Sequence, residues 1–155
     1  MPQLVPPHSS KTVKPLLLPE AERAEECKRA STLKRIPLDS RAVSDVFMLA
    51  MGAYTPLDGF MGHDDWRGSC LDMKLSSGVF WPIPITLPVN KELADSIHSQ
   101  EEVTLIDASS GEILALMEVH EKYAIDKALE KDSLSGLLTM EICEKPKHHS
   151  KSGDD

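Results

Sequence analysis

The sequence predicts an α+β fold in which helices come first and a β-rich half follows. Apolar residues recur at helical spacing over residues 43–50, and apolar segments typical of strands appear after residue 79. Turns rich in glycine separate these segments, which favours hairpins in the second half. A chain of 155 residues fits one domain with tails, and we expect its strands to form a small, partly closed barrel decorated with helices.

The first 19 residues predict an extended arm. Five prolines occur there, and each fixes the backbone and lacks a hydrogen-bond donor. We expect Leu16, Leu17 and Leu18 to hold this arm against the body. The predicted organisation is an arm at 1–19, one domain at 20–131 and a divergent, partly disordered tail at 132–155.

Two helices are expected next. Residues 20–32 are rich in Ala, Glu, Lys and Arg, which predicts a surface helix. After the extended segment 36–38, Asp39 or Ser40 can cap a second helix that Gly52 ends. Its apolar residues lie on all sides, so we expect it to be buried, with one face made of the following residues: Val43, Val46, Phe47 and Ala50.

A third helix should begin at Asp64 or Asp65, with Trp66, Cys70 and Met73 on one face. After a turn at Ser77-Gly78, residues 79–89 predict a strand. Its three prolines, Pro82, Pro84 and Pro88, should leave one strand edge unpaired.

Asn90 can cap a short helix over residues 91–97. Two strands should follow, with Val103 and Leu105 on one face of the first and a turn at 107–111. Residues 113–119 are apolar on both faces, which predicts an interior strand. A last short helix is expected over 125–131, with Asp126 near its start.

Composition excludes several classes of function. The net charge is −8, and residues 91–132 contain eleven acidic residues against four lysines. Nucleic-acid contacts need clustered Lys and Arg, so we expect no nucleic-acid partner. The three cysteines are too far apart for a zinc site or a disulfide framework, and we expect reduced thiols. No signal peptide or membrane span is predicted, which indicates a cytoplasmic protein without a membrane partner.

Individual candidates each have a functional and a structural interpretation. His63-Asp64-Asp65 could be a metal or acid–base cluster, or a helix N-terminus with capping carboxylates. Cys70 could be a nucleophile or a core thiol, and His148-His149 an incidental metal site or a polar tail. The aromatic residues Tyr54, Phe60, Trp66 and Trp81 could be a stacking platform for a base, or core.

Several motifs resemble one family. Residues 52–62 (GAYTPLDGFMG) and 81–87 (WPIPITL), with Ser40–Asp45 and Glu121–Tyr123, resemble the N-terminal domain of sulfate adenylyltransferase (ATP sulfurylase) of the sulfate-reducer type. The resemblance covers roughly residues 4–131. It implies a PUA-like β pseudo-barrel that precedes a catalytic domain. It also implies a parent reaction of ATP with sulfate, giving adenosine 5′-phosphosulfate and diphosphate with magnesium.

The sequence departs from the family in two places. His8-Ser9-Ser10 stands where the family has His-Gly-Gly, and the match is lost beyond about Lys131. The family's catalytic segments, Gln-x-Arg-Asn and His-x-x-His, do not occur, since no Gln follows Gln100 and no Arg follows Arg67. Joining two anions requires preorganised positive charge. We therefore expect a C-terminally truncated chain that has no catalytic, cofactor-binding or metal residues and is inactive alone.

Three hypotheses follow for its partners. The first is a catalytic domain or full-length sulfurylase subunit, which Arg41 and Lys74 could contact, with a homo-oligomer as a further option. The second is a non-catalytic docking module of a sulfur-metabolism enzyme, which would use the arm and the strand edge at 82–88. The third, an RNA-binding PUA-type module, is disfavoured by the acidic charge.

Overall fold

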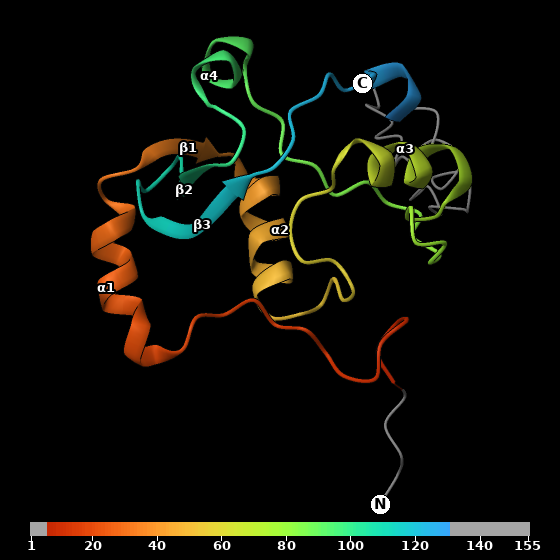
Figure 1. Cartoon of the computed structure of the whole chain (residues 1–155), viewed down its shortest axis with the longest axis horizontal. Helices are drawn as coiled ribbons and strands as arrows, with labels where there is room; N and C mark the ends of the chain where they lie inside the picture. Colours follow the sequence, from red (N-terminus) through yellow and green to blue (C-terminus); the bar gives the residue numbers. More distant parts are fainter. Residues whose placement is uncertain (1–5, 131–155) are drawn as a thin grey trace, which may run out of the picture.

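A computed structural model describes residues 6–130, which form a small mixed sheet and four helices, one of them well apart from the sheet (Figure 1). This confirms the predicted α+β class. The strands lie in the order β1-β2-β3, so β2 is central. In chain order the elements are α1 (Glu20–Ala30), β1 (Lys34–Leu38), α2 (Ser40–Ala50), α3 (His63–Asp72), α4 (Lys91–Ser96), β2 (Glu101–Asp107) and β3 (Ile113–Val119).

The sheet combines a parallel and an antiparallel pair. β1 runs parallel to β2, with Ile36 opposite Leu105, although the sequence predicted only an extended segment there. β2 runs antiparallel to β3, with Val103 opposite Met117, and the register shifts next to Leu105. The prediction that residues 113–119 form an interior strand is wrong, because β3 lies at an edge of the sheet that residues 6–130 form, and most of its residues are only half-buried.

Helices α1 and α2 cover opposite faces of the sheet. Val103 and Leu105 belong to the core cluster that contains Val46 of α2. Thr104, between them on the strand, donates its hydroxyl to the carbonyl oxygen of Ala30 at the end of α1. Successive strand residues point to opposite faces, so the two helices must lie on different sides.

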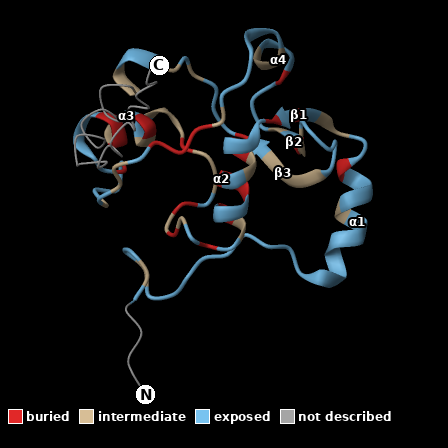
Figure 2. Ribbon diagram, turned by 180° about the vertical axis from the view of Figure 1, so that it is seen from behind, coloured by how far each residue is buried: buried red, intermediate tan, exposed pale blue. Residues whose placement is uncertain are grey.

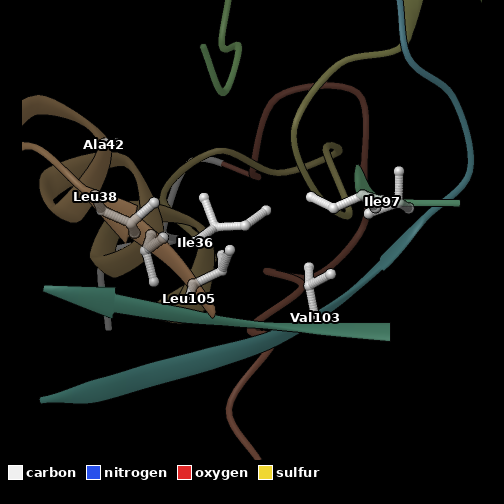
Figure 3. Packing of buried hydrophobic residues seen from close by; sticks show 8 residues of the cluster. Ile36, Leu38, Ala42, Ile97, Val103 and Leu105 are labelled. Carbon is white, nitrogen blue, oxygen red and sulfur yellow. The ribbon is translucent and has the colours of Figure 1, made fainter. Parts of the chain in front are cut away.

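The buried side chains form two clusters (Figure 2). One lies between the sheet and α2, where Figure 3 shows Ile36, Leu38 and Leu105 gathered with Ala42. The other surrounds α3, with Trp66 and Cys70 at its centre. The partly buried Phe60 packs against both clusters and so connects them.

Helix α2 begins and ends where the sequence predicted, but the face that it buries differs from the predicted one. The Asp39 carboxylate accepts the Ala42 N–H at 2.8 Å, and Gly52, with φ +78°, follows the last turn. The buried face consists of Ala42, Asp45, Val46 and Leu49. Phe47, Met48 and Met51 are exposed, so the expectation of a helix buried on all sides is wrong.

Helix α3 is not capped by its own carboxylates as predicted. The N-cap residue is Gly62, and Asp64 and Asp65 lie within the first turn. The Glu121 carboxylate accepts the His63 N–H at 3.1 Å and so fulfils the capping role from a distant segment. Met73, expected on the buried face, is exposed and lies in the left-handed region with φ 53°.

The strand predicted at residues 79–89 is wrong. Within the described residues this segment has no regular structure apart from a single bridge between Lys74 and Phe80. The segment packs into the interior and does not join a sheet. Pro84 is fully buried, and the Met61 N–H donates to the Ile85 carbonyl at 2.8 Å. The unpaired strand edge that the second hypothesis needed at 82–88 therefore does not exist.

The later caps agree with the sequence. The Asn90 side chain accepts the Leu93 N–H at 2.8 Å at the start of α4, and Asp126 accepts the Ala128 N–H at 2.9 Å in the final helical turn. No helix among residues 6–130 is long and apolar enough to cross a membrane. The predicted tail at 132–155, His148-His149 and Cys143 lie outside the described residues.

Candidate interaction surfaces

The arm lies on the body, but its leucines are not what holds it there. Main-chain atoms carry the attachment: Leu16 N–H donates to the Ala50 carbonyl at 3.0 Å, and Lys14 N–H donates to the Thr55 hydroxyl at 2.9 Å. Farther out, His8 Nε2 lies 2.6 Å from the Phe80 carbonyl oxygen. The arm thus crosses the end of α2, and its three leucine side chains remain 40–61% exposed.

An exposed apolar surface, which we call the arm–α2 strip, follows from this attachment. The Leu16–Ala50 hydrogen bond brings the arm's leucines next to the last turn of α2. Leu17 is 61% exposed and Phe47 53% exposed, which is far from a core position. Exposed apolar side chains that two neighbouring segments bring close together are candidates for an interaction site. The strip consists of Leu16, Leu17, Leu18, Phe47 and Met51.

A second exposed apolar surface, the α3 patch, lies where α3 ends. Trp81 N–H donates to the Met73 carbonyl at 2.7 Å, and Lys74 pairs with Phe80. These contacts bring residues on either side of the Ser77-Gly78 turn together. Phe80 is 56% exposed. The patch consists of Leu71, Met73, Phe80 and Ile83.

The four aromatic residues that could have formed a stacking platform are used in packing. Tyr54 meets Trp81 edge to face with ring centroids 5.9 Å apart. Trp66 is buried, and its ring centroid lies 5.7 Å from that of Tyr123, which was not among the four aromatic candidates. Their polar groups are also occupied: Trp66 Nε1 donates to Glu130, and Trp81 Nε1 donates to a main-chain carbonyl. No flat aromatic face is assembled by these residues.

A buried pair joins α2 to the following loop. The Tyr54 hydroxyl donates to the Asp45 carboxylate at 2.9 Å, and Asp45 is only 7% exposed. Burial, and then this hydrogen bond, raises the pKa of Tyr54 to about 12. The pair is structural, because Tyr54 stays protonated at neutral pH and keeps its donor on the carboxylate.

The His63-Asp64-Asp65 segment does not assemble a metal site. His63 Nδ1 lies 3.3 Å from the Asp64 carboxylate, while Asp65 accepts both the N–H and the hydroxyl of Ser76. Between residues 6 and 130, no group of three or more His, Cys, Asp or Glu side chains is placed to hold a metal ion. The segment therefore organises the start of α3 and the loop beyond it.

Cys70 is a core thiol, and the two candidate basic residues lie apart on the surface. Cys70 is buried in the cluster around α3, and burial, followed by the charge of Glu130, raises the pKa of its thiol. This opposes formation of a nucleophilic thiolate. Arg41, at the start of α2, and Lys74, after α3, are exposed on separate elements.

A small hollow of about 240 Å³ lies where β1 and β2 end and α2 begins. Its two carboxylates are already engaged, since Asp39 caps α2 and Asp107 accepts the hydroxyl and N–H of Ser109. The Ser109 hydrogen bonds hold the pKa of Asp107 below its usual value. The remaining lining residues are Leu38, Ser40, Val43 and Ala108. The hollow is therefore a junction of β1, β2 and α2 whose two carboxylates already have structural hydrogen bonds.

Comparison with known proteins agrees with the motifs. A model of the PUA-like domain family matches residues 5–136. The chain is 54% identical over 135 residues to sulfate adenylyltransferase of Syntrophobacter fumaroxidans, covering 86% of this chain and 33% of that protein. It is 52% identical over 128 residues to the same enzyme of Chlorobaculum tepidum, covering 82% of this chain and 32% of that protein.

A solved structure is also similar. The hexameric APS kinase from Thiobacillus denitrificans matches 79% of this chain and 24% of its own, with a TM-score of 0.68 and 32% identity. The chain thus spans about a third of the curated relatives it matches. The family model covers most of the 155 residues, and the chain therefore belongs to the PUA-like domain family.

Proposed function

We propose that this chain is the PUA-like domain of a sulfate adenylyltransferase and acts there as a non-catalytic docking module. The observation that carries the proposal is the 54% identity to one third of such an enzyme, combined with two exposed apolar surfaces. The remaining two thirds of the enzyme would bind ATP, magnesium and sulfate. This domain would supply a rigid surface on which that part packs.

The described residues support a docking role better than a catalytic one. Bringing sulfate to an ATP phosphate needs converging cations, and a magnesium ion needs oxygen ligands. Of the exposed basic residues in the described part, Arg29 is committed to Glu26 and Glu102, while Arg41 and Lys74 lie on separate elements. Within residues 6–130, these three cations do not converge on one site and no acidic group is placed to hold a metal ion, so we assign the described residues no chemical step.

The α3 patch is the better placed of the two surfaces for the rest of the enzyme. The described chain ends at Glu130, whose carboxylate accepts the Trp66 Nε1–H of α3 at 3.2 Å. Figure 1 shows this last blue segment beside α3. A domain joined after this point would start beside α3, the helix whose C-terminal end carries the α3 patch.

A chimera tests the proposal. The 135 matched residues of the Syntrophobacter fumaroxidans relative are replaced by the matching residues of this chain. We expect the chimera to fold and to form adenosine 5′-phosphosulfate, while the 155-residue chain alone forms none. A folded chimera without activity, or activity from the pure chain, would contradict the proposal.

Paired substitutions in the chimera locate the docking face. Phe80→Asp in the α3 patch should lower activity or yield, because it would place a charge in a buried apolar interface. Phe47→Asp in the arm–α2 strip is the matched control, with nearly the same exposure in the isolated domain. If only Phe47→Asp impairs the chimera, the docking face is the strip and the assignment to the α3 patch is wrong.

A further inference from the structure

Among residues 6–130, no other strand pairs with the outer edge of β3. In an antiparallel pair, alternate residues direct their N–H and C=O groups to the partner strand, and the others direct theirs away. Within residues 6–130, the main-chain hydrogen bonds outside the ladder reach β3 only at Val119, whose carbonyl accepts the Gln100 N–H beside β2. The outward backbone groups of β3 therefore have no main-chain partner in the described part of the chain.

The other edge of the sheet is protected in the way that edge strands usually are. β1 contains Pro37, which has no N–H to offer, and its exposed residues include Arg35. Proline and charged side chains are the devices that prevent edge-to-edge pairing. β3 has neither proline nor lysine, and Glu118 is its one charged residue. The two edges of one sheet thus differ in their capacity to accept another strand.

We propose that β3 pairs antiparallel with β3 of a second copy of this chain, across a two-fold axis at Leu116. The sequence of the strand is self-complementary in that arrangement. Leu116 faces its own counterpart, Ala115 faces Met117, and Ile113 faces Val119. Glu118 faces Leu114, so no two like charges lie opposite each other, which is the pairing that destabilises a ladder.

In this dimer, the outward N–H and C=O groups of β3 would form hydrogen bonds with the second copy in place of water. The dimer also extends the three-stranded sheet of each copy into one six-stranded sheet, since the order in each copy ends at β3. Isologous pairing of one patch with itself is the usual basis of a two-fold dimer. The inference does not depend on the proposed function, because it uses only β3 and its edge.

Opposite charges at the two-fold position give a direct test with the 155-residue chain. Wild type should show the mass of a dimer by sedimentation or light scattering. Leu116→Lys and Leu116→Glu, each alone, should shift to monomers, because like charges would then lie opposite each other. An equimolar mixture of the two variants should return to the dimer mass. Arg35→Glu, on the protected edge, is the control that should leave the dimer unchanged.

Several results would overturn the inference. These are a monomeric wild type at every concentration, an assembly that persists in Leu116→Lys, or a mixture that stays monomeric although circular dichroism shows both variants folded. If the variants do not fold, hydrogen exchange on wild type decides instead. Alternate β3 amides should then lose protection on dilution, and protection that does not depend on concentration would exclude the dimer.

Discussion

Replacing Gly52 by alanine should release the arm from the body. Gly52 has φ +78°, and a Cβ atom added there would lie 2.4 Å from the Val13 Cγ1, 2.9 Å from the Pro15 nitrogen and 3.0 Å from the Lys14 carbonyl carbon. The Val13 side chain can rotate away, but the main-chain atoms cannot. The arm must therefore move as a segment, which breaks its hydrogen bonds to Ala50 and Thr55.

The magnitude follows from two contributions. A non-glycine residue in the left-handed region costs about 1–2 kcal/mol. Loss of the two arm hydrogen bonds adds roughly 0.5–1.5 kcal/mol each. Gly78 is the matched control, because its φ is +85° but a Cβ there would have no heavy atom within 4 Å. Gly78→Ala should show only the conformational cost.

Two assays measure the difference between Gly52→Ala and Gly78→Ala. Urea unfolding should give a free energy of unfolding about 1–3 kcal/mol lower for Gly52→Ala than for Gly78→Ala, equal to the arm contribution. Limited trypsin digestion should cleave after Lys11 faster in Gly52→Ala, since that bond lies in the arm. Equal stability and equal cleavage in the two variants would refute the claim that Gly52 is needed for the arm to bind the body.

Three other predictions concern the interior. Tyr54→Phe should lower the free energy of unfolding by about 1–3 kcal/mol, because it leaves the buried Asp45 carboxylate without its donor; an unchanged urea midpoint would contradict this. Gly68→Ala should destabilise α3 despite the better helix propensity of alanine, because its Cβ would lie 2.4 Å from a main-chain carbonyl oxygen; thermal unfolding checks this. Burial, and then the charge of Glu130, raises the pKa of the Cys70 thiol above its ordinary value. Cys70 should therefore resist alkylation at mildly alkaline pH while the exposed Cys27 reacts, as read by peptide mass mapping, and its reactivity should rise only at higher pH than that of an ordinary thiol.

Local signals in the sequence predicted local structure well. Asp39 and Asn90 were predicted as caps because a short polar side chain before an apolar segment can accept the first free N–H groups. Gly52 was predicted to end α2, where a left-handed residue is needed. Each of these predictions depends on residues fewer than five positions apart.

Predictions that depend on distant contacts failed. The pairing of β1 with β2 joins residues about 70 positions apart, and no local pattern encodes it. The buried face of α2 was predicted wrongly because apolar residues lie on all sides of the helix. Asp45 is buried there, and its carboxylate accepts a hydrogen bond from the Tyr54 hydroxyl, a contact that the sequence pattern does not reveal. The segment at 79–89 has the composition of a strand, but its prolines remove donors, and burial of Pro84 favours packing without a ladder.

For the candidate surfaces, the sequence identified the arm but not its partner. The leucines predicted the arm's docking, yet main-chain bonds to Ala50 and Thr55 achieve it and leave the leucines exposed. The α3 patch was missed, because Met73 and Phe80 look like core residues in sequence and become surface only through the turn between them. The family assignment rested on several motifs in order, and the comparisons confirmed it.

The rate at which the chimera forms adenosine 5′-phosphosulfate from ATP and sulfate tests the central claim most directly. If this chain is the docking domain of a sulfate adenylyltransferase, the chimera should work at a rate comparable to that of the Syntrophobacter fumaroxidans relative, and Phe80→Asp should reduce that rate. A soluble, folded chimera that forms no product would show that the domain does not support the catalytic part, whatever its sequence similarity.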